Sequence, residues 1–251
     1  MEEHRATFEL IGEGEAVSKS LSTREIQENL LRWGLNESLK IKRFRYGGKF
    51  ASSDATSFLS SLLSSCRDLN VRPDSQLDWQ KLKCTVLNME FFDRLHEGTI
   101  ATEAGTVRMC MDEDIEGKVV SDLLREMLAN PTSENTELFS KEEEQQEFIF
   151  QLFKMLCLGG AMMQPDEITE AYLETTKVLY KDVVSVYRSA KTRAIEIGSV
   201  VYQIFGSKED PGNECGDLFP NSASPYNFCF IIINPSLKQS ILIYQPFVSF
   251  W

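Results

Sequence analysis

The sequence predicts an α+β fold in which helices pack against a mixed, largely antiparallel sheet within a single compact domain. Helix-period apolar patterns dominate the first 180 residues, and two strand-turn-strand patterns follow them. Helices and strands do not alternate regularly, so repeated βαβ units are not indicated. The chain has 251 residues and no glycine–proline linker, which favours one large domain over residues 1–251.

The first predicted elements are a short strand at residues 7–11 and a helix that follows it. Ser22 and Glu25 have the spacing of a capping box, which predicts a helix start at Ser22. Ile26, Leu30 and Trp33 continue at helical spacing, and Gly34 is a natural residue just past the helix end.

A strand at residues 39–46 and a second helix come next. The apolar residues of this strand change phase once, which predicts a bulge near Lys42 and Arg43. Ser53 or Asp54 can cap the helix, whose apolar face is expected to contain Phe58, Leu59, Leu62, Leu63 and Cys66.

The central region predicts shorter elements. Alternation indicates strands at residues 82–86 and 107–111. A short helix is expected at residues 91–95, closed by Gly98, and Ser121 is expected to cap a helix that ends before Pro131.

Two longer helices and two hairpins complete the prediction. Ser140 and Glu143 form a second capping-box pattern, for a helix that Gly159 stops. Pro165 is expected at the first position of the next helix, whose inward face would hold Ile168, Tyr172, Thr176, Leu179 and Tyr180. The hairpins are expected to pair residues 183–187 with 195–205, and 228–233 with 241–247. The polar segment 206–225 is expected to be a mobile loop.

Composition indicates an acidic globular protein. Lysine and arginine total 26 against 38 aspartate and glutamate residues, a net charge of −12, which disfavours nucleic-acid binding. The longest uninterrupted apolar run has six residues, so no membrane span or secretory signal is expected. The cysteines are widely spaced, and we expect reduced thiols in an intracellular protein.

No catalytic or metal-binding pattern is recognisable, so we expect neither an enzyme nor a cofactor. The two histidines, His4 and His96, lack metal-ligand spacing, and no Cys-x-x-Cys motif occurs. The alternative is a thiol-dependent enzyme in which His96 activates Cys84 or Cys110.

One basic cluster reverses the overall charge of the chain. It contains Lys40, Arg43 and Arg45, together with Lys42 and Lys49. It has two interpretations, the outer face of a strand or a docking patch for an acidic partner.

Three segments together are more specific than any single motif. They are residues 152–161 (LFKMLCLGGA), residues 172–177 (YLETTK) running on to 180–182 (YKD), and Cys84-Thr85 followed by 91–95 (FFDRL). In order and spacing they closely resemble the cilia- and flagella-associated protein 300 family, and weaker similarity covers nearly the whole chain.

The resemblance implies a non-enzymatic factor for assembly or transport of outer and inner axonemal dynein arms. It implies a place in the cytoplasm and along the axoneme of motile cilia, and a link to intraflagellar transport. The implied partner is a kintoun-type dynein assembly factor, a co-chaperone, with dynein-arm or intraflagellar transport components as further candidates. A stably bound axonemal subunit is the remaining alternative.

One polar face within the resembling segments is a candidate partner-binding surface. Glu174, Lys177 and Lys181 lie at positions i, i+3 and i+7 of a predicted helix. They can pair with one another along the helix or bind a partner. With Lys40, Arg43 and Arg45 they are the predicted partner-binding residues.

Overall fold

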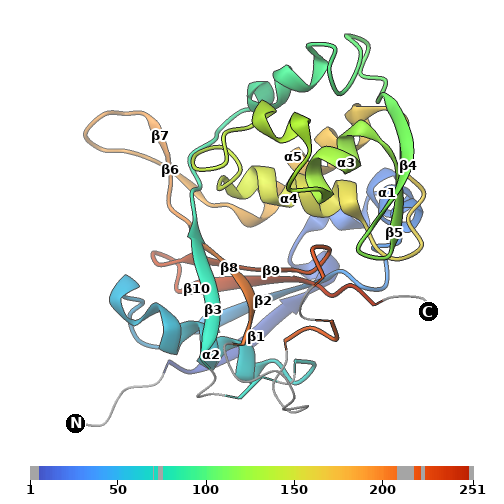
Figure 1. The fold of residues 1–251 in the computed structure, drawn as a ribbon. Helices are drawn as coiled ribbons and strands as arrows, with labels where there is room; N and C mark the ends of the chain where they lie inside the picture. Colours follow the sequence, from blue (N-terminus) through green and yellow to red (C-terminus); the bar gives the residue numbers. More distant parts are fainter. Residues whose placement is uncertain (1–5, 70, 73–75, 208–217, 222–223, 249–251) are drawn as a thin grey trace.

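The computed structural model describes residues 6–69, 71–72, 76–207, 218–221 and 224–248 (Figure 1). At its centre is a six-stranded sheet in the order β1-β2-β10-β9-β8-β3, with every neighbouring pair antiparallel. Its strands are β1 (Phe8–Glu13), β2 (Lys40–Tyr46), β3 (Leu77–Leu82), β8 (Val200–Ser207), β9 (Phe228–Asn234) and β10 (Gln239–Gln245). The predicted α+β class is confirmed.

Two further pairs of strands lie outside this sheet. They are β4 (Met109–Ile115) with β5 (Lys118–Asp122), and β6 (Val186–Arg188) with β7 (Ile195–Ile197). The β6–β7 hairpin projects from the body of the molecule, at the left of Figure 1.

The helices are short and lie on both faces of the sheet. The α-helices are α1 (Arg24–Arg32), α2 (Ala55–Ser65), α3 (Leu123–Ala129), α4 (Phe148–Leu158) and α5 (Thr169–Val183). The 3₁₀ helices are η1 (Gly14–Ala16), η2 (Lys19–Ser22), η3 (Ser52–Asp54), η4 (Met89–His96) and η5 (Glu134–Leu138).

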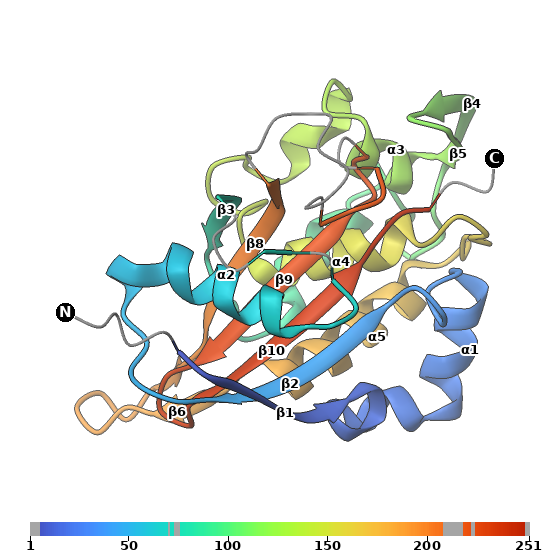
Figure 2. The ribbon, with the colours of Figure 1, turned by 90° about the horizontal axis from the view of Figure 1, so that it is seen from below.

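The sheet is the middle of three layers. Helices α4 and α5 cover one face and α2 covers the other, as Figures 1 and 2 show from two directions. Strand β9 is therefore apolar on both faces: Phe230 and Ile232 pack in the α4–α5 core, and Ile231 and Ile233 pack in the α2 core. This explains the uninterrupted apolar run of the sequence, which a one-sided sheet would not need.

Most of the predicted loop at 206–225 lies outside the described residues. Gly206 belongs to β8, and Leu218 and Phe219 are buried. The ring of Phe219 stacks on Tyr244 with 5.5 Å between centroids and 6° between planes. These described parts of the segment are packed against the sheet.

Helix α1 begins at Arg24, so the predicted capping box at Ser22 is wrong. The hydroxyl of Ser22 donates instead to the carbonyl oxygen of Lys19 over 2.6 Å, because residues 19–22 form η2. The predicted end is confirmed: Gly34 has a φ of +64°, and the N–H of Leu35 donates to the carbonyl oxygen of Leu30 over 2.8 Å. This is the Schellman pattern.

Helix α4 begins at Phe148, eight residues after the predicted cap Ser140. The backbone of Glu147 is extended and bridges Lys83, whose carbonyl oxygen accepts from the N–H of Phe148 over 2.8 Å. The carboxylate of Glu147 also accepts from the N–H of Thr85 over 3.0 Å. Pairing with a segment sixty residues earlier therefore overrides the local capping pattern. The predicted stop at Gly159 is confirmed.

Helix α5 begins at Thr169 and not at Pro165, and Ile168 is 50% exposed instead of facing inward. Residues before the helix are held by other segments: the carbonyl oxygen of Glu167 accepts from the N–H of Val107 over 2.8 Å. The other four residues of the predicted inward face are buried.

Several shorter elements also differ from prediction. Strand β3 ends at Leu82, where a strand was expected to start. The bulge predicted near Lys42 and Arg43 is wrong: the register shift lies in β1, between Leu10 and Gly12, and β2 pairs regularly with β10. The apolar residues of β2 change phase because both of its faces are buried. The cap of α3 is Asp122 instead of Ser121. The expected helix at 91–95 lies within the 3₁₀ helix η4, and the strand expected at 195–205 is divided between β7 and β8.

Candidate partner-binding surfaces

The predicted polar face of α5 contains an ion pair and one free lysine. The ammonium of Lys177 lies 2.7 and 3.0 Å from the two carboxylate oxygens of Glu174, and both side chains are about half exposed. Lys181 is exposed in the last turn, and within the described part of the chain it has no ion-pair partner. A lysine in this turn complements the negative end of the helix dipole.

The three residues of this face border two different hollows. Lys177 and Lys181 line a hollow of about 480 Å³, together with Leu87, Met89 and Glu90 from the segment around η4. Glu174 lines a separate groove of about 860 Å³ between α1 and α5. Glu90 and Asp93 also line this hollow, so its two lysines face two carboxylates, and Leu87, which is 56% exposed, adds accessible apolar surface.

The basic residues of β2 do not form one patch. Side chains alternate along a regular strand, so Lys40 and Lys42 point to the α2 side, and Arg43 and Arg45 point to the other side. Lys42 is buried and lies 3.0 Å from Glu13 and 2.5 Å from Asp68. Its charge is used within the fold.

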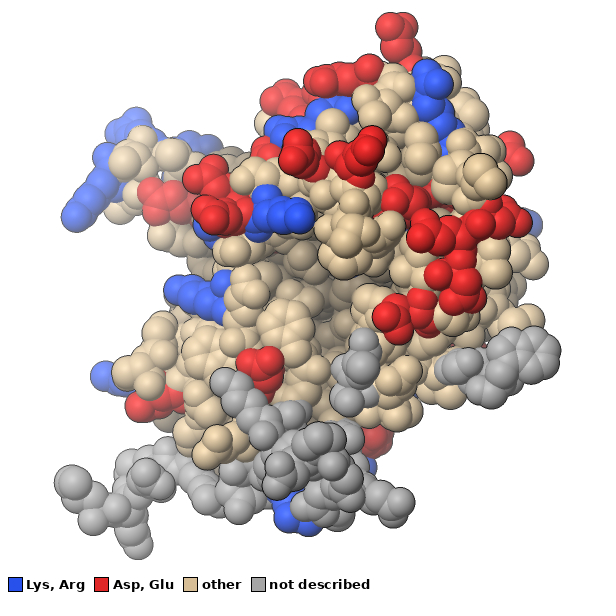
Figure 3. All heavy atoms as spheres, in the orientation of Figure 1, with Lys and Arg blue, Asp and Glu red and all other residues tan. Residues whose placement is uncertain are grey.

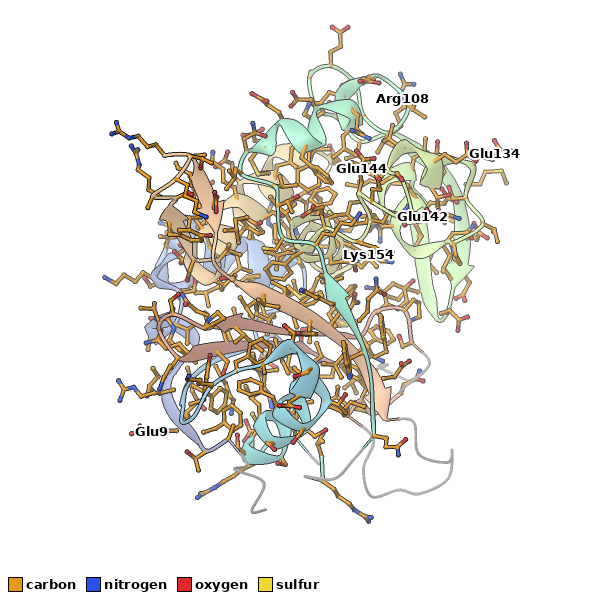
Figure 4. The ribbon with its side chains drawn as sticks, turned by 90° about the vertical axis from the view of Figure 1, so that its left-hand side faces the viewer. Glu9, Arg108, Glu134, Glu142, Glu144 and Lys154 are labelled. Atoms are coloured by element: carbon orange, nitrogen blue, oxygen red, sulfur yellow. The ribbon has the colours of Figure 1, made fainter. Side chains whose placement is uncertain are left out.

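Arg43 and Arg45 differ in how firmly the fold holds them. A guanidinium nitrogen of Arg43 donates to the carbonyl oxygen of Val17 over 3.0 Å, and its Nε is buried and forms no hydrogen bond with any described residue. Arg45 is exposed and its Nη1 lies 3.6 Å from Glu9, which stands at the outer surface in Figure 4. Of these two arginines, Arg45 is the one available to a partner.

Within the described ranges, no histidine forms a hydrogen bond with Cys84 or Cys110, the thiols of the predicted enzymatic alternative. Burial raises the pKa of Cys84 to about 11, and its sulfur lies 3.4 Å from the hydroxyl of Tyr180. Burial and neighbouring carboxylates raise the pKa of Cys110. His96 is engaged elsewhere, with its Nε2 2.9 Å from the hydroxyl of Thr169. These contacts oppose thiolate chemistry, which needs a lowered pKa.

A partly buried lysine, which the sequence did not predict, joins α4 to the β4–β5 hairpin. The ammonium of Lys118 donates to the carbonyl oxygens of Leu158 over 2.5 Å and Gly160 over 2.8 Å, and it lies 4.6 Å from the ring centroid of Tyr226. Burial lowers its pKa to about 7. This cation closes the carboxyl end of α4, which structurally explains part of the resembling segment around Gly159.

Helix α4 has one cation, Lys154, which is half-buried and is labelled in Figure 4. Burial lowers its pKa, and it makes no ion pair or hydrogen bond with any residue that the structure describes. It is the one charged residue of a helix that is otherwise almost entirely buried.

Charge is unevenly distributed over the surface. Figure 3 shows basic side chains gathered on the projecting β6–β7 hairpin and acidic ones over the β4–β5 hairpin on the opposite side. Over the described ranges, no group of three or more histidine, cysteine, aspartate or glutamate residues is arranged to hold a metal ion. No helix among these residues is long and apolar enough to cross a bilayer.

The fold and its surface define an α+β protein whose accessible features are charged hollows between helices. Its sequence matches the profile of cilia- and flagella-associated protein 300 over residues 7–245. The chain belongs to the cilia- and flagella-associated protein 300 family and is a cilium- and flagellum-associated protein.

Two relatives with that name illustrate the match. The protein from Paramecium tetraurelia is 30% identical over 243 residues, which cover 92% of this chain and 91% of the relative. The protein from Chlamydomonas reinhardtii is 29% identical over 253 residues, covering 93% and 96%. No solved structure is significantly similar to this chain.

Proposed function

We propose that this protein is a non-enzymatic factor for assembly or transport of outer and inner axonemal dynein arms. It acts through protein–protein contacts and is needed for ciliary motility. The observation that carries this function is the hollow beside α5, where Lys177 and Lys181 border the exposed Leu87. Membership of a ciliary family supports the cellular setting.

The partner proposed for this hollow is a kintoun-type dynein assembly factor, with dynein-arm or intraflagellar transport components as further partners. Lys181, which forms no ion pair with any described residue, lies beside the exposed Leu87, and this combination suits a partner segment that carries a carboxylate and an apolar anchor. The protein would meet the assembly factor in the cytoplasm and accompany its cargo along the axoneme.

Loss of the protein in a ciliated cell tests the proposed function directly. Electron microscopy of axonemes should show missing outer and inner dynein arms, and re-expression of the wild-type protein should restore them. Intact arms in the knockout would contradict the proposal. Salt extraction of isolated cilia separates a transported factor, which should be released, from a permanent axonemal subunit, which should remain.

Charge reversal tests the surface. Lys181→Glu should weaken capture of the kintoun-type factor by at least about fivefold, because it replaces an attraction by a repulsion and leaves the Glu174–Lys177 ion pair intact. Lys141→Glu is the matched control, since this exposed lysine lies away from the hollow. Melting temperatures should be equal. Equal capture by both folded variants would show that the hollow is not the contact.

A further inference from the structure

A wide surface groove lies between α1 and α5. Its volume is about 860 Å³, and its walls come from residues 25–32 and 165–174. The two helices lie side by side in Figures 1 and 2.

The groove is strongly acidic. Its lining contains six carboxylates against one cation, Arg32. Three of the carboxylates are paired: Glu28 with Arg24, Asp166 with Arg32, and Glu174 with Lys177. The other three are exposed and form no ion pair with any residue that the structure describes; they are Glu25, Glu167 and Glu170.

The groove also exposes apolar side chains. Leu31 is 62% exposed and Ile168 is 50% exposed, and both line the groove. Leu31 stands out on α1 because its neighbours Ile26 and Leu30 are buried in the core. Exposed apolar side chains that are rimmed by charged residues are typical of a surface that binds another molecule.

The walls of the groove are firmly joined. Beneath it, the side-chain amide of Asn29 donates to the hydroxyl of Thr175 over 3.1 Å, and the indole N–H of Trp33 donates to Asp166 over 2.7 Å. The rings of Trp33 and Tyr172 stack with 4.6 Å between centroids. A preformed site of this kind loses little conformational entropy when it binds a ligand.

We propose that this groove binds a basic amphipathic helix of a partner protein. A third helix can place its side-chain ridge between two packed helices, with apolar residues on Leu31 and Ile168 and with Lys or Arg facing the unpaired glutamates. The wall formed by residues 25–32 is about 10 Å long, so about two helical turns would make contact. The inference does not depend on the proposed ciliary function.

A model peptide tests the recognition. The probe is a fluorescently labelled 18-residue peptide of leucine and lysine, with leucines at helical i, i+3, i+4 and i+7 spacing. The control is a scrambled peptide of the same composition. The amphipathic peptide should bind the full-length protein at least about tenfold more tightly, measured by anisotropy at physiological salt, because only it can present both faces together. Equal binding would overturn the proposal.

Matched charge variants locate the site. Neutralising Glu25, Glu167 and Glu170 to glutamine should weaken peptide binding at least about tenfold, since each exposed contact contributes a modest share. The control neutralises Glu113, Glu134 and Glu137, which are exposed away from the groove and change the net charge equally. Equal weakening in both triple variants would mean that the peptide is attracted to the overall negative charge of the protein, and this result would overturn the proposed site.

Leu31→Ser tests the apolar floor of the groove and should weaken peptide binding several-fold at unchanged melting temperature.

Sedimentation of the protein alone tests a different occupant of the groove. The β6–β7 hairpin of a second copy carries Arg188, Lys191 and Arg193 and is also complementary in charge. The wild type should stay monomeric. Self-association that the groove variant abolishes would assign the groove to a second copy and overturn the proposal.

Discussion

The backbone of Gly160 lies directly against that of Gly34, so that a β-carbon at position 160 would overlap the carbonyl oxygen of Gly34. The N–H of Gly160 donates to the carbonyl oxygen of Trp33 over 2.8 Å. This contact joins the carboxyl ends of α1 and α4, next to the end of α4 that Lys118 closes. The glycine pair of the resembling segment therefore stops a helix and also allows two backbones to pack closely.

Gly160→Ala should lower the free energy of unfolding by about 1–3 kcal/mol, because one of the two backbones must move. Gly160 does not have a left-handed φ, so the effect would be steric. Gly12→Ala is the control, since its β-carbon would meet Ala16 at an ordinary 3.5 Å. Urea unfolding measures both. Equal, small losses in the two variants would contradict the close packing.

Lys118 should make stability depend on pH. Burial lowers its folded pKa to about 7, while an unfolded lysine titrates near ~10.4, so the unfolded state binds more protons between these values. The contribution of Lys118 to stability therefore rises with pH above about 7 and is constant below it. The stability of wild type relative to Lys118→Met should increase from pH 6.5 to 8.5 in urea unfolding. A difference that is independent of pH would contradict this geometry.

The two arginines of β2 should differ in their effect on stability. Arg43→Ala removes a charged donor to the carbonyl oxygen of Val17 and should cost about 1–2 kcal/mol. Arg45→Ala removes only an exposed pair at 3.6 Å and should change stability by less than about 0.5 kcal/mol. Thermal unfolding distinguishes them. Equal losses of stability in the two variants would show that Arg43 is not held by Val17. If the prediction is correct, Arg45→Glu is the variant with which to test this strand as a partner surface.

Cysteine alkylation should be slow in the native protein. A pKa of about 11 leaves the Cys84 thiolate more than about 100-fold rarer at neutral pH than that of a free cysteine. Mass spectrometry after iodoacetamide treatment should find Cys110, on the largely exposed strand β4, modified before the half-buried Cys84 and the buried Cys66, Cys157 and Cys229. Urea-unfolded protein is the control, in which all should react. Rapid modification of native Cys84 would revive the thiol-enzyme alternative.

Elements whose signals are local could be predicted from the sequence. The terminal hairpin of β9 and β10 follows from apolar runs on either side of Asn234-Pro235-Ser236, and Gly34 and Gly159 end their helices as expected. A left-handed residue after a helix depends on a few neighbouring atoms, so the sequence pattern determines it.

Helix starts were decided by contacts between distant segments. Glu147 is extended because it pairs with Lys83, and residues before Thr169 are held by Val107 and Trp33. A capping box contributes about 1 kcal/mol, which several tertiary hydrogen bonds outweigh. The predicted starts at Ser140 and Pro165 failed for this reason.

The surfaces also divide into features set by local spacing and features set by contacts between distant segments. The α+β class, the acidic charge and the spacing that places Glu174 and Lys177 within reach of one another on one helix all follow from the amino-acid sequence alone. Tertiary packing is what holds Arg43 at Val17 and leaves Arg45 exposed, and it brings glutamates from α1 and from residues 167–174 to one groove. Pairing along a helix depends on positions three or four apart, whereas a groove depends on how two helices pack.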